Sequence, residues 1–142
     1  MYYSDLVNKA ANISYEAHHK QKDKGKYPYF MHPLTLALQL NDEISVCVAL
    51  LHDVVEDHAK DGYTMEYLAN EFPKEVIDAL KLLTHDDKIG YLNYIMAIKN
   101  NPIARQVKLL DLKHNTDVRR NNNVKPHKYD LYLQAIQILE EN

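Results

Sequence analysis

The segment from Glu43 to His58 constrains the fold more than any other, because hydrophobic residues cover nearly every side of it when it is drawn as a helix. These residues recur without a wide polar stripe: Ile44, Val46, Val48, Leu50, Leu51, Val54 and Val55. A helix that is hydrophobic all round is buried among other elements. We therefore expect a central helix over residues 43–58, with the rest of the chain packed around it.

The composition favours helices throughout the chain. Only 3 of the 142 residues are Gly and 5 are Pro, which is about half the share of an average protein. An all-β fold needs turn residues every ten positions or so, and this chain has too few. The pattern predicts one compact all-α domain over residues 1–142. It has seven or eight helices, over about 4–21, 33–40, 43–58, 64–72, 73–83, 89–99, 102–118 and 127–140.

Local signals mark several of these helix ends. Ser4 and Thr64 precede hydrophobic periodic segments and are expected to act as N-caps, because their hydroxyl groups can accept a hydrogen bond from the first turn. Pro33 and Pro102 are expected at the start of their helices, where the missing N–H costs nothing. His32 would then lie at the N-terminal end of the helix that Pro33 opens.

Charge and cysteine content limit the partners and the compartment. The 17 basic and 20 acidic residues give a formal net charge of −3, unlike the basic footprint of nucleic-acid-binding domains. The longest hydrophobic run, residues 46–51, is far shorter than the ~20 residues that cross a bilayer. The N-terminus has no hydrophobic leader, and Cys47 is the single cysteine. We expect a cytoplasmic protein that binds neither nucleic acid nor membrane, with Cys47 packed in the core and the oligomeric state left open.

Four ionisable residues stand inside the most hydrophobic part of the chain. The run LLHDVVED, residues 50–57, contains His52, Asp53, Glu56 and Asp57. An uncompensated carboxylate in a dry core is costly, so these acids must be paired, solvated in a cleft or bound to a cation. On a continuous helix their spacings of three and four would place all four around one pocket. The alternative is a core histidine with satisfied hydrogen bonds and acids on a solvated face.

Two other segments supply further candidate ligands. PYFMHP places His32 at a helix start, and VKLLDLKHN places Asp111 among leucines. Two histidines and two acids from three segments make a set of two nitrogen and two oxygen ligands for a divalent ion, with positions left for water. The residues alone leave Mn²⁺, Fe²⁺, Mg²⁺ and Zn²⁺ open.

These residues resemble the H…HD…D signature of the HD-domain metal-dependent phosphohydrolases. Within that family, PYFMHP, HDVVED and VKLLDLKHN resemble the hydrolase domain of the RelA/SpoT homologues and the small alarmone hydrolases, which remove the 3′-pyrophosphate from (p)ppGpp. The resemblance extends from about Ala17 to Arg120. It implies an HD-domain helical fold and a nucleotide as the small-molecule substrate.

The resemblance also implies roles for individual residues. Glu56 and Asp57 would orient or deprotonate the attacking water and assist the leaving group. Asn115, one turn after Asp111, would hydrogen-bond the substrate or the ligands of the metal. A single Mn²⁺ would be held by His32, His52, Asp53 and Asp111.

The expected substrate contacts depart in part from the family pattern. Characterised members carry Arg-Lys before the metal histidine, where this chain has Asp23-Lys24. Lys22 and Lys24 belong to a basic cluster that can attract phosphates or remain solvated. Tyr91 can stack on a base or pack in the core. We expect hydrolysis of (p)ppGpp to GDP and pyrophosphate; the alternatives are a related hydrolase of another nucleotide or phosphorylated metabolite, and a non-catalytic nucleotide-sensing module.

Other residues are expected to lie outside this chemistry. Arg119 and Arg120 are expected to be exposed cations at a helix end. Lys108 can pair with a neighbouring acid or with phosphate. His18 and His58 are assigned no role. The segments that carry synthetase activity in long bifunctional relatives have no counterpart among these 142 residues, so we expect no synthetase activity.

Overall fold

The computed structural model describes residues 1–142, and they form an array of α-helices without strands. Short 3₁₀ helices, η1 (Ala59–Asp61) and η2 (Val118–Asn121), follow α4 and α8. The all-α prediction is therefore confirmed. The α-helices are α1 (Asp5–His18), α2 (Met31–Leu38), α3 (Glu43–Leu51), α4 (Val54–His58), α5 (Met65–Glu71), α6 (Lys74–Leu83), α7 (Tyr91–Lys99), α8 (Pro102–Asn115) and α9 (Tyr129–Glu140).

Several helix starts follow the predicted local signals. As predicted, the side chains of Ser4 and Thr64 accept hydrogen bonds from backbone N–H groups in the first turns of α1 and α5. Asn101, for which no cap was predicted, does the same for α8. These bonds satisfy donors that have no partner within the helix. Pro102 is the first residue of α8, as expected. Helix α2 starts before Pro33, at Met31, because the loop carbonyls of residues 28 and 29 accept the N–H groups of residues 31 and 32.

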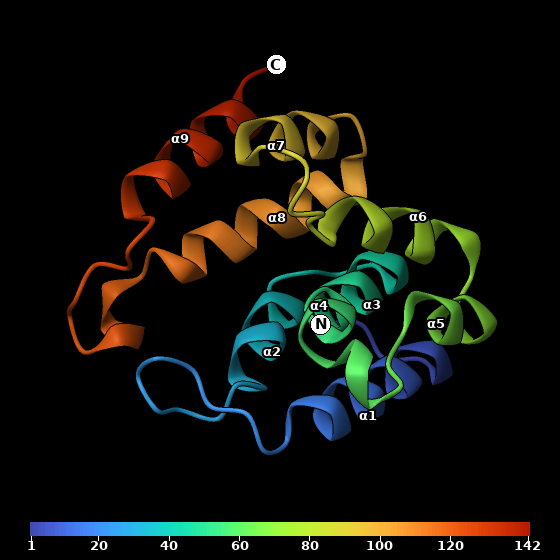
Figure 1. Ribbon diagram of the computed structural model, residues 1–142. Coiled ribbons are helices and arrows are strands. Elements are labelled where there is room, and N and C mark those ends of the chain that lie inside the picture. Colours follow the sequence, from blue (N-terminus) through green and yellow to red (C-terminus); the bar gives the residue numbers. More distant parts are fainter.

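Helix α3 is the centre of the hydrophobic core. Every residue from Ser45 to Leu51 is buried, and α3 packs against α1, α2, α6 and α8. In Figure 1, α8 crosses the middle of the molecule, with α1–α5 on one side and α7 and α9 on the other. Cys47 lies within this core, where burial raises the pKa of its thiol to about 12. The expected packing role of Cys47 agrees with this position.

The expected continuous helix over residues 43–58 is wrong at one point. Helix α3 ends at Leu51 and α4 begins at Val54, so His52 and Asp53 lie in a break between them. The imidazole Nδ1–H of His52 donates to the carbonyl oxygen of Ala49 at 2.6 Å. Successive residues of a continuous helix point about 100° apart. His52 and Asp53 keep right-handed helical backbone conformations through this break.

The loop between α1 and α2 lies directly against η2. A Cβ atom at Gly25 would come within 2.0 Å of the carbonyl oxygen of Arg120, so only glycine fits this approach. Figure 1 shows the same proximity: the blue loop after α1 lies next to the orange turn after α8. The contact brings the basic loop residues to the same side of the molecule as the C-terminal end of α8.

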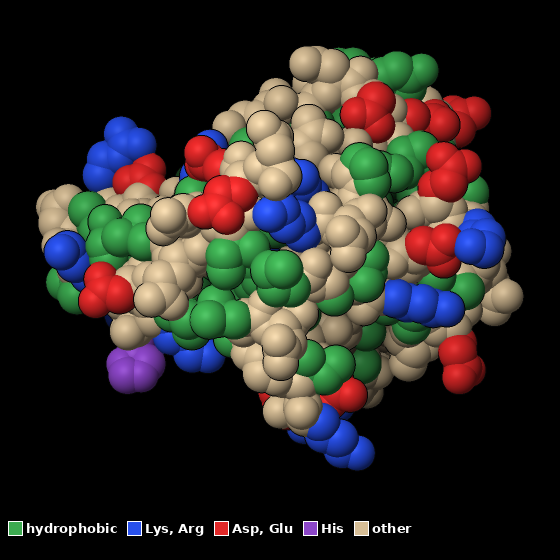
Figure 2. Space-filling model, turned by 90° about the horizontal axis from the view of Figure 1, so that it is seen from above, with side chains coloured by type: hydrophobic (Ala, Val, Ile, Leu, Met, Phe, Trp, Pro, Cys, Tyr) green, Lys and Arg blue, Asp and Glu red, His purple; other side chains and the backbone are tan.

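The surface over α7 and α9 is mixed in character. Figure 2 shows hydrophobic, acidic and basic side chains interspersed on this face, without a large area of one sign. Leu92, Met96 and Leu133 are among the exposed hydrophobic residues of these helices. None of the helices combines the length and the hydrophobicity that crossing a membrane requires.

Candidate metal centre

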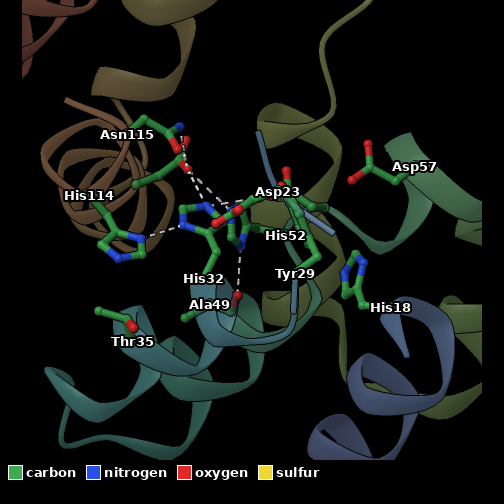
Figure 3. A network of polar contacts seen from close by, with 12 residues as sticks. His18, Asp23, Tyr29, His32, Thr35, Ala49, His52, Asp57, His114 and Asn115 are labelled. Atoms are coloured by element: carbon green, nitrogen blue, oxygen red, sulfur yellow. Dashed lines mark hydrogen bonds and ion pairs between the residues drawn. The ribbon is translucent and has the colours of Figure 1, made fainter. Parts of the chain in front are cut away.

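Three separated segments bring two histidines and two aspartates to one point. His32 comes from the first turn of α2, Asp111 from α8, and His52 and Asp53 from the break between α3 and α4. One possible ligand atom from each residue lies within 4.8 Å of all the others. His32, His52 and Asp111 are buried and Asp53 is nearly so. The two histidine rings lie side by side in the centre of Figure 3, with centroids 5.2 Å apart.

The hydrogen bonding of His52 provides the sharpest test of whether a cation fits here. Because Nδ1 donates to Ala49, the neutral ring presents a lone pair at Nε2. This Nε2 atom is buried and has no hydrogen-bond partner, although carboxylate oxygens of Asp53 and Asp111 lie 3.0 and 3.4 Å away. A lone pair facing carboxylate oxygens is unfavourable unless a proton or a metal ion lies between them. The residues present therefore fit a divalent cation.

Both ring nitrogens of His32 have partners that orient the ring. Its Nε2 lies 2.8 Å from Asp111 Oδ1 and 3.6 Å from Asp53 Oδ2. Its Nδ1 lies 2.7 Å from Nδ1 of His114, and the two rings are stacked with an interplanar angle of 5°. A partner of this kind fixes the ring orientation and the tautomer of a metal-binding histidine. His114 was not predicted, although its position three residues after Asp111 places both on one helix face.

The two aspartates are held by further donors. Lys108 donates to Asp111 Oδ2 at 2.8 Å, and the Asn115 amide donates to Asp111 Oδ1 at 3.1 Å. The hydroxyl of Tyr29 donates to Asp53 Oδ2 at 2.6 Å. Lys108 thus pairs with an acid, one of the two options that the sequence left open. These bonds fix the carboxylates before any ligand binds.

The electrostatics favour ionised aspartates. Burial works to raise the pKa of Asp111, but Lys108 and the two histidines outweigh it and hold this pKa well below its usual range. For Asp53, burial is likewise outweighed by His52, and the pKa is lowered. Burial lowers the pKa of His52, but the two carboxylates raise it well above the ordinary value. A positive charge, either a proton or a metal ion, is therefore strongly favoured among these four residues.

Glu56 and Asp57 lie beside this group on different sides. The side chain of Glu56 accepts from the backbone N–H of His85 at 3.1 Å, whereas that of Asp57 accepts from the Gln21 amide at 3.1 Å. The arrangement of both acids with His52 and Asp53 around one pocket stays a prediction. The hydrogen bonds show that Glu56 faces the segment after α6 and that Asp57 faces the loop after α1.

Both acids have pKa values raised above the ordinary range. For Glu56 the causes are burial and then the charge of Asp53. The same two causes, in the same order, raise the pKa of Asp57. A carboxyl group whose pKa is moved towards neutrality can take up or release a proton more readily at physiological pH. This is the property that a proton-transferring residue beside the centre needs.

Two cavities adjoin the centre and share Asn115 and Tyr132. The first, of about 270 Å³, is lined by Lys22, Lys24 and Arg120 among others. The second, of about 170 Å³, is lined by residues that include Glu56, Tyr91 and Lys108. The structure thus places the expected substrate residues Lys22, Lys24 and Asn115 around one cavity and Tyr91 at the other. Tyr91 also stacks on Tyr94, with centroids 5.7 Å apart.

Arg120 differs from its expected exposed position. Its side chain is only 19% exposed, and it donates to Asn115 Oδ1 at 2.8 Å and faces Asp23 at 3.6 Å. Arg119 is exposed and pairs with Asp117, as a helix-end cation would. The close approach of Gly25 to Arg120, which the sequence does not reveal, accounts for the difference. His18 and His58, which had no assigned role, contact Gln21 next to Asp57.

Comparisons with known proteins give related sequences and a related structure. No protein-family model matches the chain. It is 35% identical over 114 residues, or 77% of its length, to a putative chloroplastic GTP diphosphokinase, RSH1, of Oryza sativa subsp. japonica, and this match covers 12% of that protein. It is 36% identical over 84 residues, or 56% of its length, to a probable guanosine-3′,5′-bis(diphosphate) 3′-pyrophosphohydrolase of Mycoplasma genitalium, of which 11% is covered. It is also 31% identical over 128 residues, or 81% of its length, to a probable GTP pyrophosphokinase of Mycobacterium leprae, of which 16% is covered.

The chain therefore spans less than a fifth of the length of these relatives. A solved structure of a metazoan ortholog of SpoT that hydrolyses ppGpp is similar over 99% of this chain and 88% of that protein. The TM-score is 0.74 at 21% sequence identity. The chain therefore has the fold of this SpoT ortholog, and its sequence is similar to segments of an RSH1 GTP diphosphokinase and of a probable guanosine-3′,5′-bis(diphosphate) 3′-pyrophosphohydrolase.

Proposed function

We propose that the chain is a metal-dependent phosphohydrolase that converts guanosine 3′,5′-bis(diphosphate) and water to GDP and pyrophosphate. The observation that carries this proposal is the convergence of His32, His52, Asp53 and Asp111, with His52 Nε2 buried and without a hydrogen-bond partner. The names of the Mycoplasma genitalium relative and of the metazoan SpoT ortholog support ppGpp as the substrate.

Mn²⁺ is the metal we propose for the four ligands. Two imidazole and two carboxylate ligands suit Mn²⁺, and they also suit Fe²⁺, Mg²⁺ or Zn²⁺. The resemblance to (p)ppGpp hydrolases favours Mn²⁺ among these. A bound divalent cation supplies Lewis acidity, which lowers the pKa of water and offsets negative charge that develops on phosphoryl oxygens.

Glu56 and Asp57 are proposed as the residues that handle protons. Each has one carboxylate oxygen in a hydrogen bond with a neutral amide, from His85 N–H and from Gln21, which leaves the other oxygen free. One of them would accept the proton of the attacking water, and the other would donate a proton to the departing ribose oxygen. This division matches two acids on different sides of the centre with raised pKa values.

The two adjoining cavities are proposed to hold the nucleotide. Lys22, Lys24 and Arg120 bring positive charge to the larger cavity, and Lys108 and Lys128 bring it to the smaller one. Asn115 borders both cavities and donates to Asp111, so it would connect substrate binding to the ligand set. A phosphate chain and a base on opposite sides of Asn115 and Tyr132 would fit this arrangement.

Residues 1–142 are proposed to form one such hydrolase domain that acts in the cytoplasm. The substrate is a small nucleotide, which a chain without a membrane-spanning helix can meet in solution. The buried free thiol of Cys47 is consistent with a reducing compartment.

Product analysis tests the proposal directly. The purified chain is incubated with ppGpp and Mn²⁺, with ppGpp and EDTA, and with a panel of other nucleoside phosphates. The proposal expects GDP and pyrophosphate in equal amounts, only with the metal. Turnover of panel members but not of ppGpp would favour another nucleotide as substrate. Binding of ppGpp without turnover under any divalent metal would favour a nucleotide-sensing module.

A further inference from the structure

Gln21 joins Asp57 to two histidines. The Gln21 amide nitrogen donates to Asp57 Oδ2 at 3.1 Å. Its amide oxygen lies 2.7 Å from Nδ1 of His18 and 2.6 Å from Nε2 of His58. The three partners come from the end of α1 and from α4, and Gln21 itself lies in the loop that follows α1. The Gln21 side chain thus contacts two histidines and Asp57, which is one of the proposed proton-transferring acids.

The carboxylate of Asp57 determines which way the amide faces. Both imidazoles can donate an N–H to one amide oxygen, because this oxygen has two lone pairs. The reversed amide would point its oxygen at the carboxylate of Asp57, and two acceptors would then face each other without a proton between them. The observed orientation is therefore favoured. Gln21 is therefore held as a hydrogen-bond donor to Asp57.

His18 is a buried part of this arrangement. It is 1% exposed, and its ring lies 4.9 Å from the ring of Tyr29, centroid to centroid. Burial lowers the pKa of His18, which favours the neutral ring with its proton on Nδ1. Its Nε2 atom is buried and has no protein partner. Tyr29 donates to Asp53, so His18 also packs against a residue that orients the metal ligands.

We propose that Gln21, held by His18 and His58, is a positioning residue that directs the Asp57 carboxylate so that it accepts the proton of the attacking water. This inference rests on the proposed function, in which one of the two acids accepts this proton, and it assigns that role to Asp57. Gln21 does not contact the four proposed metal ligands directly. Figure 3 shows His18 and Asp57 together on the opposite side of the centre from His114.

The charges around Asp57 indicate how its pKa would change if Gln21 were replaced. Burial and the negative charge of Asp53 raise the pKa of Asp57, whereas the hydrogen bond from Gln21 and the nearby His18 and His58 lower it. Without the amide donor the pKa of Asp57 would rise further. An acid that must be ionised to accept a proton would then lose activity at a higher pH than in the wild type. The freed carboxylate would also rotate, and a misdirected proton acceptor slows the chemical step.

Two substitutions of Gln21 distinguish the effect of its hydrogen-bond donor from the effect of its side-chain shape. Gln21→Met keeps the length of the side chain and removes both hydrogen-bonding groups. Gln21→Glu keeps an acceptor for the two histidines but replaces the donor by a second carboxylate facing Asp57. The proposal expects the pKa of Asp57 to increase in the order wild type, Gln21→Met, Gln21→Glu. The matched control is Gln134→Glu, which adds the same charge at an exposed position of α9.

The experiment combines kinetics with a titration of Asp57 itself. For both Gln21 variants we expect kcat to fall by about 10- to 100-fold, with KM for ppGpp and affinity for Mn²⁺ nearly unchanged and the acidic limb of the pH profile moved to higher pH. Carboxyl ¹³C NMR, assigned with Asp57→Asn, measures the pKa of Asp57 without substrate. A wild-type pH profile and an unchanged pKa of Asp57 in Gln21→Met would overturn the proposal.

An inactive wild type or an unfolded Gln21→Met variant would still allow the role of Gln21 to be tested. If the wild type does not hydrolyse ppGpp, the proposed function fails, while the NMR titration still decides whether Gln21 controls Asp57. If Gln21→Met does not fold, His58→Ala removes one of the two donors at a less buried site. A smaller change of kcat and of the pKa of Asp57 in the same direction would support the proposal, and no change in either would contradict it.

Discussion

His32 Nδ1 lies 2.7 Å from His114 Nδ1, with the two imidazole rings stacked in parallel. One nitrogen must donate and the other accept. If His32 offers the lone pair of Nε2 to a cation, its proton is on Nδ1 and His114 is the acceptor. Burial, followed by the charges of Arg120 and His32, lowers the pKa of His114 to about 4, so His114 is neutral at physiological pH and can accept.

Removal of this acceptor is predicted to weaken metal binding. In His114→Ala, we expect the affinity for Mn²⁺ to fall by about 10- to 100-fold, because His32 loses the partner that fixes its tautomer and ring orientation. Calorimetric titration of the metal-free protein with Mn²⁺ measures this change. His127→Ala, at an exposed histidine, is the control. Equal affinities in the wild type and His114→Ala would show that His114 does not orient a ligand.

Glu56→Gln is predicted to lower activity and raise stability together. The pKa of Glu56 is raised in the folded protein, by burial and by Asp53. The folded state therefore binds this proton more tightly than the unfolded state, and stability falls as the pH rises from the unfolded to the folded pKa. The penalty persists at higher pH, and Gln removes it. We expect kcat to fall by at least about 100-fold, with a higher melting temperature at pH 7 but not at pH 3.

An exposed glutamate provides the control for Glu56→Gln. Glu66→Gln changes the same charge on an exposed residue of α5 and should leave kcat unchanged. Equal kcat values for Glu56→Gln and the wild type would remove Glu56 from the proposed mechanism. A lower melting temperature at pH 7 would contradict the sign of its pKa shift.

The buried pair of Lys108 and Asp111 is predicted to stabilise the metal-free protein. Lys108→Met leaves Asp111 buried with one positive neighbour fewer, and removal of one partner from a buried ion pair typically costs about 3–5 kcal/mol. A bound cation would replace part of the lost positive charge, so the loss should be smaller with saturating Mn²⁺ than with EDTA. Urea unfolding under both conditions measures the difference. The exposed pair of Lys74 and Asp78 provides the control, since Lys74→Met should change little in either condition.

Metal binding is also predicted to raise the melting temperature. A ligand at 100 times its dissociation constant stabilises the folded state by about 2.7 kcal/mol. For a chain of this size that corresponds to roughly 10 °C. Differential scanning fluorimetry with Mn²⁺ and with EDTA tests this, and Asp111→Asn should abolish most of the increase. A wild-type melting temperature that is the same in both solutions would argue against a built metal site.

The parts of the fold that could be predicted depend on local chemistry. Ser4 and Thr64 cap helices because a hydroxyl satisfies nearby N–H groups whatever the rest of the chain does. The hydrophobic pattern of residues 43–58 similarly predicted a buried central helix, and α3 is its first part. His32, His52, Asp53 and Asp111 were identifiable because their polar groups interrupt hydrophobic segments or lie beside a helix start.

The parts that could not be predicted depend on tertiary contacts. At the break the imidazole of His52 donates to the carbonyl oxygen of Ala49, and the hydrophobic pattern of the sequence continues through it without a signal. The position of Arg120 depends on a loop that approaches it at Gly25, nearly a hundred residues earlier in the sequence. The roles of His114 and Gln21 depend on partners in other elements. Such residues carry no periodic signal of their own.

Anomalous diffraction from crystals grown with Mn²⁺ tests the central claim most directly. The account predicts one strong anomalous peak within bonding distance of His32 Nε2, His52 Nε2 and one oxygen each of Asp53 and Asp111. It also predicts that His52 keeps its hydrogen bond from Nδ1 to Ala49. A crystal with Mn²⁺ bound elsewhere, or with no peak among these four side chains at saturating metal, would contradict the account.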